Sequence, residues 1–363
     1  MRWLSTPLVA VSLSLGLSAI SHASQIEHKG NICTTPGSVW KYGNGGIIVF
    51  PENQSYWIAS RLNPILSDVT IEWPGERRDF SPQFSDDLDY WRNHSYPVAF
   101  QNHAAGFVIT GRNITIDGYG TEEAGKTQPG RPMPFVFWNV SNIHVDNFYF
   151  NNINCNVTAI DAPYGANWVQ NTDGFDTMNA RNIRLTNFVY QGGDHCVTIK
   201  PRSYDVDIHN VTCRGGMASP PAAAYIKTCI GVPTPQDSYE SAGLPRGGGW
   251  GNVSNIIFSK FEVQGANTGP MIYQNEGNNG SYAGTSLMTV SDITFANFTA
   301  YVTNENEVTS NISCSENHPC YDIDFDNVLL NITKSAGKIS ENRHENCPIR
   351  IRSLFHLVAT SVS

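Results

Sequence analysis

Short segments in which apolar and polar residues alternate recur along the chain. Each begins with Asn or Asp and continues with Ile, Val, Leu or Phe at every second position; the copies are NITIDGYG from Asn113, NIHVDNFYF from Asn142, NIRLTNFVY from Asn182, DVDIHNVTC from Asp205, NIIFSKFEV from Asn255, DITFANFTA from Asp292 and DIDFDNVLL from Asp322. A period of two predicts half-buried β-strands. No long apolar stripe with helical spacing occurs beyond the N-terminal segment.

The spacing of these copies predicts a solenoid. Most lie about twenty to forty residues apart, the range that is typical of stacked repeats. Parallel strands stacked coil on coil would bury each apolar face against the next coil, and Asn at equivalent turns could adopt left-handed backbone and hydrogen-bond along the stack. A β-sandwich or a propeller would also contain many short strands, but at closer spacing or with several strands per repeat. We therefore expect an all-β parallel β-helix.

The N-terminus has the pattern of a secretory signal peptide, with Arg2, an apolar stretch and a small-residue site at Ser21-His22-Ala23. We expect residues 1–23 to be removed and the protein to be secreted; a membrane anchor is disfavoured because the apolar run is short. No linker divides the rest, so residues 24–363 are interpreted as one domain, with a cap and first coils over 24–112 and an atypical tail over 343–363.

The charge balance narrows the class of partner. Asp and Glu number 32 against 23 Lys and Arg, and no basic cluster is interleaved with aromatic residues, which disfavours nucleic acid. An acidic polysaccharide stays possible, because a local cation can bind it. We expect a monomer without a membrane partner, cofactor or metal.

Eight cysteines in an exported chain indicate disulfides. We expect Cys196–Cys213 and Cys314–Cys320; Cys33, Cys155, Cys229 and Cys347 stay unassigned, because sequence does not fix connectivity. Glycosylation sequons, each a weak motif alone, occur at Asn53, Asn93, Asn113, Asn139, Asn156, Asn210, Asn252, Asn279, Asn297, Asn311 and Asn331.

Two motifs stand apart from the repeats, NTDGFDT over residues 171–177 and GGDHCVTIKP over residues 192–201. Asp173 and Asp194 are separated by about one coil, so stacking would make their carboxylates neighbours. Paired carboxylates hydrolyse glycosidic bonds, although a single Asp in a turn is more often structural. Together the two favour a catalytic site.

These two motifs resemble the N-T-D and D-D-C motifs of the polygalacturonase family of pectin hydrolases, which are right-handed parallel β-helices. The resemblance extends from about Cys33 to about Lys338. GGDHC in place of a D-D pair is similar to the exo-acting branch, galacturan 1,4-alpha-galacturonidase or rhamnogalacturonan galacturonohydrolase. The resemblance implies a secreted enzyme that releases terminal galacturonic acid from polygalacturonate or rhamnogalacturonan, with inversion.

The resemblance also implies roles for individual residues. Asp194 matches the general acid and Asp173 one of two water-activating carboxylates. His195 stands where the second belongs, which leaves Asp173 as the expected sole base and His195 to position water or sugar, or to serve a structural role. Asp176 is a lower-ranked polar neighbour.

The segment AYIKT over residues 224–228 resembles the R-I-K substrate clamp of the family. Tyr225 stands in place of Arg, and Lys227 is retained to pair with a uronate carboxylate. A solvated surface Lys is the alternative. Tyr273 is a weaker candidate for sugar contact.

One departure concerns the segment after Cys213. The family continues with Gly-His-Gly or Gly-Asn-Gly, whereas this chain reads RGGMASPP over 214–221 and reaches AYIKT at once. One coil is expected to be missing there, either as a true deletion or through a mistaken gene model. Alternatives to the exo-hydrolase are therefore a catalytically impaired pectin-binding β-helix and an endo-acting rhamnogalacturonan hydrolase.

Overall fold

The computed structural model describes residues 9–11, 32–33, 44–50, 56–58, 60–73, 82–84, 90, 96–98, 101–103, 105–118, 121–123, 133–152, 173–192, 195–214, 222–235, 247–266, 268–277, 281–302, 309–332 and 349–351. The chain forms two compact units, residues 1–218 and 219–363. The interpretation of residues 24–363 as a single domain stays a prediction. Within the part of the chain that the structure describes, no helix is long and apolar enough to cross a membrane.

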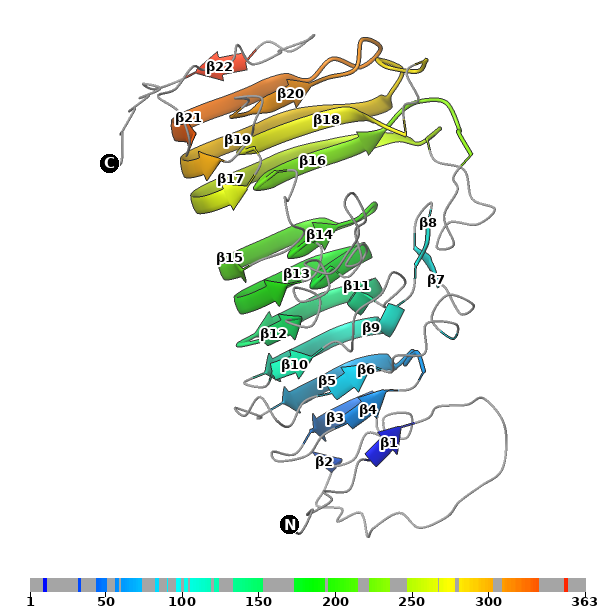
Figure 1. Cartoon of the computed structure of the whole chain (residues 1–363). Coiled ribbons are helices and arrows are strands. Elements are labelled where there is room, and N and C mark those ends of the chain that lie inside the picture. Colours follow the sequence, from blue (N-terminus) through cyan, green and yellow to red (C-terminus); the bar gives the residue numbers. More distant parts are fainter. Residues whose placement is uncertain are drawn as a thin grey trace, which may run out of the picture. The chain divides into compact units, whose positions relative to one another are not determined.

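The first unit is a stack of parallel strands (Figure 1). Its strands are β1 (Val9–Val11), β2 (Ile32–Cys33), β3 (Asn44–Val49), β4 (Tyr56–Ile58), β5 (Ile65–Trp73), β6 (Pro82–Phe84), β7 (Tyr96–Val98), β8 (Gln101–His103), β9 (Ala105–Gly118), β10 (Thr121–Glu123), β11 (Met133–Asp146), β12 (Tyr149–Asn152), β13 (Phe175–Gly192), β14 (Val197–Ile199) and β15 (Tyr204–Arg214). One run of neighbouring, hydrogen-bonded strands has the order β15-β13-β11-β9-β5-β3-β2. Only β7 and β8 pair in an antiparallel manner among the described strands.

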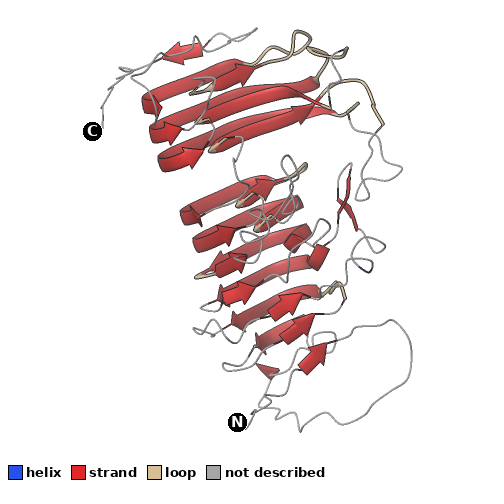
Figure 2. Cartoon of the chain, in the orientation of Figure 1, coloured by secondary structure: helices blue, strands red, loops and turns tan. Residues whose placement is uncertain are grey.

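The second unit contains two parallel sheets, also stacked coil on coil (Figure 2). One sheet has the order β16-β18-β20 and the other β17-β19-β21-β22. The strands are β16 (Ala224–Cys229), β17 (Trp250–Ala266), β18 (Pro270–Glu276), β19 (Leu287–Val302), β20 (Asn311–Ser313), β21 (Tyr321–Ile332) and β22 (Ile349–Ile351). Because β22 pairs in parallel with β21, residues 349–351 of the tail continue the sheet. The parallel β-helix predicted from the repeat is confirmed.

Each unit has its own apolar core. In the first unit, inward residues of successive coils lie in register, as Ile114, Ile143 and Ile183 do on β9, β11 and β13. In the second unit the rings of Phe258 and Phe295 stack at a centroid distance of 5.1 Å. Burial of these rows is the main stabilising contribution, at about 25 cal/mol per Å² of apolar surface.

Every repeat begins at a left-handed residue. The first residues of the seven copies all have positive φ, between 52° and 57°, at Asn113, Asn142, Asn182, Asp205, Asn255, Asp292 and Asp322. Asn and Asp tolerate this conformation better than other residues with a side chain. Their amides also form a ladder along the stack, in which Asn182 Nδ2 donates to Asn142 Oδ1 (2.9 Å) and Asn142 Nδ2 donates to Asn113 Oδ1 (2.7 Å).

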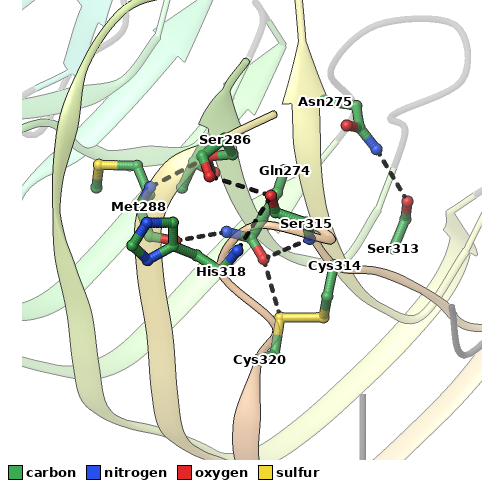
Figure 3. Close-up of a disulfide and its surroundings, with 10 residues drawn as sticks. Gln274, Asn275, Ser286, Met288, Ser313, Cys314, Ser315, His318 and Cys320 are labelled. Atoms are coloured by element: carbon green, nitrogen blue, oxygen red, sulfur yellow. Dashed lines mark hydrogen bonds between the residues drawn. A yellow bond between two sulfur atoms is a disulfide. The ribbon is translucent and has the colours of Figure 1, made fainter. Parts of the chain in front are cut away.

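The two predicted disulfides are present. Cys196–Cys213 joins the start of one coil to its end, and Cys314–Cys320 closes the turn after β20. Beside the second, the buried Gln274 amide donates to Met288 O (2.8 Å) and accepts from Ser315 N (3.1 Å), which ties β18 to β19 and to the disulfide turn (Figure 3).

The strand ladders end at β15 in the first unit and at β17 in the second. Among the described strands, β15 pairs only with β13, and β17 only with β19. Ile208 on β15 is 36% exposed, although its partner Leu185 on β13 is fully buried. The coil expected to be missing after Cys213 stays a prediction.

Candidate active site

The two aspartate motifs lie on adjacent coils. Gly174 N donates to His195 O (2.9 Å), and Phe175 on β13 is in register with Val197 on β14. Gly174 is required for this approach, because a Cβ there would lie 2.7 Å from Cys196 O and 2.6 Å from the Tyr190 ring. Stacking therefore brings residues 173–177 against residues 195–199 of the adjacent coil.

Asp173 is held on both carboxylate oxygens. Its Oδ1 accepts from His195 N (3.2 Å) and lies 3.4 Å from His195 Nδ1. Its Oδ2 accepts from Thr198 Oγ1 (3.0 Å) and lies 3.5 Å from Lys200 Nζ. The Asp173 side chain is only 6% exposed, whereas the His195 side chain is 37% exposed.

Lys200 also pairs with a second buried carboxylate. Its Nζ lies 3.1 Å from Asp176 Oδ1, and the Asp176 side chain is fully buried. One ammonium is thus placed between two carboxylates on the inner side of the site. Buried charges are tolerated only when they are paired in this way.

These contacts separate the pKa values of the two carboxyls. Burial alone would raise the pKa of Asp173, but the hydrogen bond from His195 and the charge of Lys200 outweigh it, so the pKa lies well below its usual value. Burial raises the pKa of Asp176 well above its usual value, with a contribution from the Asp173 charge. Burial lowers the pKa of Lys200, but the two carboxylates raise it by more, so the net shift is upward. Asp173 is therefore the anion that balances Lys200, and the raised pKa of Asp176 favours its protonated form.

The second unit carries the other predicted residues. Tyr225 and Lys227 lie on β16, and Lys227 is in register with Tyr273 on β18. The Lys227 side chain is 43% exposed, and its Nζ lies 4.0 Å from Glu276 Oε1. Burial and the Glu276 charge raise the pKa of Tyr225, so its hydroxyl stays protonated. Tyr225, Lys227 and Tyr273 therefore form one local cluster with Glu276.

Several predicted site residues fall elsewhere. Asp194 lies outside the described residues, as do the sequons at Asn53, Asn93, Asn156 and Asn279. Of the other sequons, Asn113, Asn139, Asn210 and Asn297 take part in the amide ladders, while Asn252, Asn311 and Asn331 lie on strands. Among the described residues, no three His, Cys, Asp or Glu side chains are placed to hold a metal ion.

Sequence reasoning missed Thr198, Lys200 and Glu276. Alternation could have indicated the first two, because residues two apart on a strand share a face. Thr198 and Lys200 are two apart, and both contact Asp173. Glu276 could be found only from the register of β16 with β18.

Comparison with known proteins identifies the family. The sequence model of glycosyl hydrolases family 28 matches residues 82–218 and 245–348. The chain belongs to this family. It is therefore a glycoside hydrolase.

Named relatives agree with this assignment. Proteins provisionally named galacturan 1,4-alpha-galacturonidase C, from Aspergillus niger and Neosartorya fischeri, are each 51% identical to this family 28 chain, over 89% and 93% of it and 92% and 96% of their own lengths. Endo-xylogalacturonan hydrolase from Aspergillus tubingensis shares the fold, with a TM-score of 0.56 at 18% identity over 86% of this chain and 93% of that one.

The relatives are longer within the aligned region. The first alignment spans 395 residues, but 89% of 363 residues is about 323, so about 70 aligned positions have no counterpart in this family 28 chain. The second gives the same difference, because 93% of 363 is about 338 against 410. This difference is consistent with the prediction, made from the short segment after Cys213, that this chain lacks residues that other family members have.

Proposed function

We propose that this family 28 chain is an exo-acting hydrolase that releases terminal galacturonic acid from polygalacturonate or rhamnogalacturonan chains. The observation that supports the proposal is the pairing of Asp173 with His195 across adjacent coils. Asp194, which precedes His195 in the sequence, is assigned its role from the motif alone. The relatives at 51% identity support the exo-acting galacturonidase specificity.

In the proposed reaction, Asp194 donates a proton to the leaving glycosidic oxygen, and the Asp173 and His195 pair activates the attacking water. Lys227 and Tyr225 would bind a uronate carboxylate, the Lys through its exposed ammonium. Asp176 would support the site from within and not touch the sugar, because its side chain is fully buried against Lys200.

We further propose that the protein is secreted, glycosylated and monomeric. The N-terminal signal pattern and the recurrent sequons support the first two. Val9–Val11, which pairs with β4, belongs to the segment that cleavage would remove. Mass spectrometry of the purified protein would locate its N-terminus and its glycans.

Product analysis tests the enzymatic proposal. Wild-type protein should release galacturonic acid monomer from oligogalacturonate, and Asp194→Asn should lower kcat by about 10²-fold to 10⁴-fold, the usual contribution of a general acid. Asp205→Asn is a matched control, because Asp205 is an exposed turn residue on β15 and Asn suits its left-handed backbone. Equal monomer release by wild type and Asp194→Asn would remove Asp194 from its role.

A second candidate is a pectin-binding β-helix without turnover. It is favoured by the absence of about 70 positions that the aligned relatives have, since losing a coil removes part of a cleft wall. Binding of oligogalacturonate without any product would support it, and larger mixed fragments would indicate an endo-acting rhamnogalacturonan hydrolase.

A further inference from the structure

The Asp173 carboxylate is poorly placed to accept a proton from water. Two donors or cations lie at each of its oxygens: His195 N and Nδ1 at Oδ1, Thr198 Oγ1 and Lys200 Nζ at Oδ2. A carboxylate stabilised by that many donors is a weak base, and general bases work best when their pKa lies near the operating pH. Its 6% exposure also leaves little surface for a water molecule.

His195 has the properties that Asp173 lacks. Its imidazole is 37% exposed, and its Nδ1 is directed at Asp173 Oδ1 at 3.4 Å. The main-chain N–H of His195 bonds the same oxygen, so the imidazole and the carboxylate are fixed to each other. A buried carboxylate behind one ring nitrogen sets the tautomer and orientation of an imidazole that meets solvent.

Resting on the proposed function, we propose that His195 is the catalytic residue that takes the proton from the attacking water, and that Asp173 is the positioning residue behind it. The water oxygen forms a bond to the anomeric carbon as its proton passes to His195. The bond from that carbon to the glycosidic oxygen breaks, and this oxygen takes the proton of Asp194. His195 then returns its proton to solvent, and Asp194 regains one.

Lys200 completes the arrangement from the other side of the carboxylate. On the buried side of the His195–Asp173 pair lie Lys200, at Asp173 Oδ2, and Asp176, beyond Lys200. Lys200 keeps Asp173 ionised and in place, so that the carboxylate orients the imidazole instead of competing with it for the water.

The proposal predicts a particular pH profile. His195 must be neutral to accept a proton, so kcat/KM should fall as the pH drops through the titration of an imidazole, ordinarily at about 6.5. With a carboxylate as the base, the fall would come near the ordinary value of Asp, about 3.9. His195→Asp should therefore move the acid limb down by roughly two to three pH units.

The experiment compares kcat/KM for galacturonate release between pH 3 and 8 in wild type, His195→Asp and His195→Gln. We expect the downward shift in His195→Asp, and in His195→Gln a loss of about 10²-fold or more in kcat with a smaller change in KM. His209→Gln is the matched control, because His209 is an exposed histidine on β15 that lies beside Asp207 and outside the site. An acid limb at the same pH in wild type and His195→Asp, or near-wild-type kcat in His195→Gln, would overturn the proposal.

A second readout does not need turnover. If wild-type protein releases no sugar, the proposed function fails, and the His195–Asp173 pair is then tested by carbethoxylation with diethyl pyrocarbonate, followed by peptide mass spectrometry across pH. Loss of the Asp173 charge in Asp173→Asn should lower the pH midpoint for modification of His195. An unchanged midpoint would show that the pair is not coupled and overturn the inference.

Discussion

In the cluster of Asp173, Asp176 and Lys200, one buried cation lies between two carboxyl groups whose pKa values are shifted in opposite directions. Lys200 lies 3.5 Å from one carboxylate and 3.1 Å from the other, and a single positive charge cannot stabilise two buried anions equally. The spacing of the two motifs predicted that Asp173 and Asp194 lie about one coil apart, because the coil length follows from the repeat; Asp194 lies outside the described residues. It did not predict Lys200, because its role depends on which strand face is turned toward the neighbouring coil.

The shifted pKa of Asp176 makes stability depend on pH. The folded pKa is raised, so the stability that Asp176 contributes is fully present below its unfolded pKa of about 3.9 and is lost as the pH rises toward its folded pKa. Asp176→Asn stays neutral, so its free energy of unfolding should fall less than that of wild type between pH 4 and pH 7.

Urea unfolding at both pH values measures this difference. Asp205→Asn again serves as the control, because its side chain is exposed on β15 and should leave the pH dependence unchanged. A fall in Asp176→Asn as steep as that in wild type would mean that Asp176 ionises freely in the folded protein.

At the scale of the elements, the amide ladders connect strand pairing to turn chemistry. In six of the seven repeats a second left-handed position follows five residues after the first. Lys260 occupies one of these positions, and the other five are Asn147, Asn187, Asn210, Asn297 and Asn327. In the hydrogen bonds of this second ladder among the described residues the later coil donates, as when Asn327 Nδ2 donates to Asn297 Oδ1 (2.8 Å). The sequence pattern predicted both the strands and these turns, because alternation and αL tolerance are local properties.

Lys260 interrupts this second ladder. It has φ of 60° and lies next to Asn297 in the register of β17 with β19. Lys260→Asn should raise the free energy of unfolding by about 1 kcal/mol, since Asn tolerates the backbone and its Oδ1 could accept from Asn297. Denaturant unfolding of Lys260→Asn beside Lys260→Gly separates the two effects, because Gly suits the left-handed backbone but cannot form the hydrogen bond. If Lys260→Asn is no more stable than Lys260→Gly, the hydrogen bond to Asn297 does not contribute.

At the scale of the whole molecule, each unit is a short stack that ends on an open strand. The edges of β15 and β17 among the described strands, and the aligned relatives with about 70 more positions, agree with the sequence argument that a coil is absent. That argument counts residues between motifs, and it stays a prediction.

The central claim is that this family 28 chain removes terminal galacturonic acid with inversion. Proton NMR during hydrolysis of an α-linked oligogalacturonate reports the first anomer released before mutarotation. The account predicts galacturonic acid monomer in the β configuration as the first product. A first product in the α configuration, or larger fragments without monomer, would contradict it.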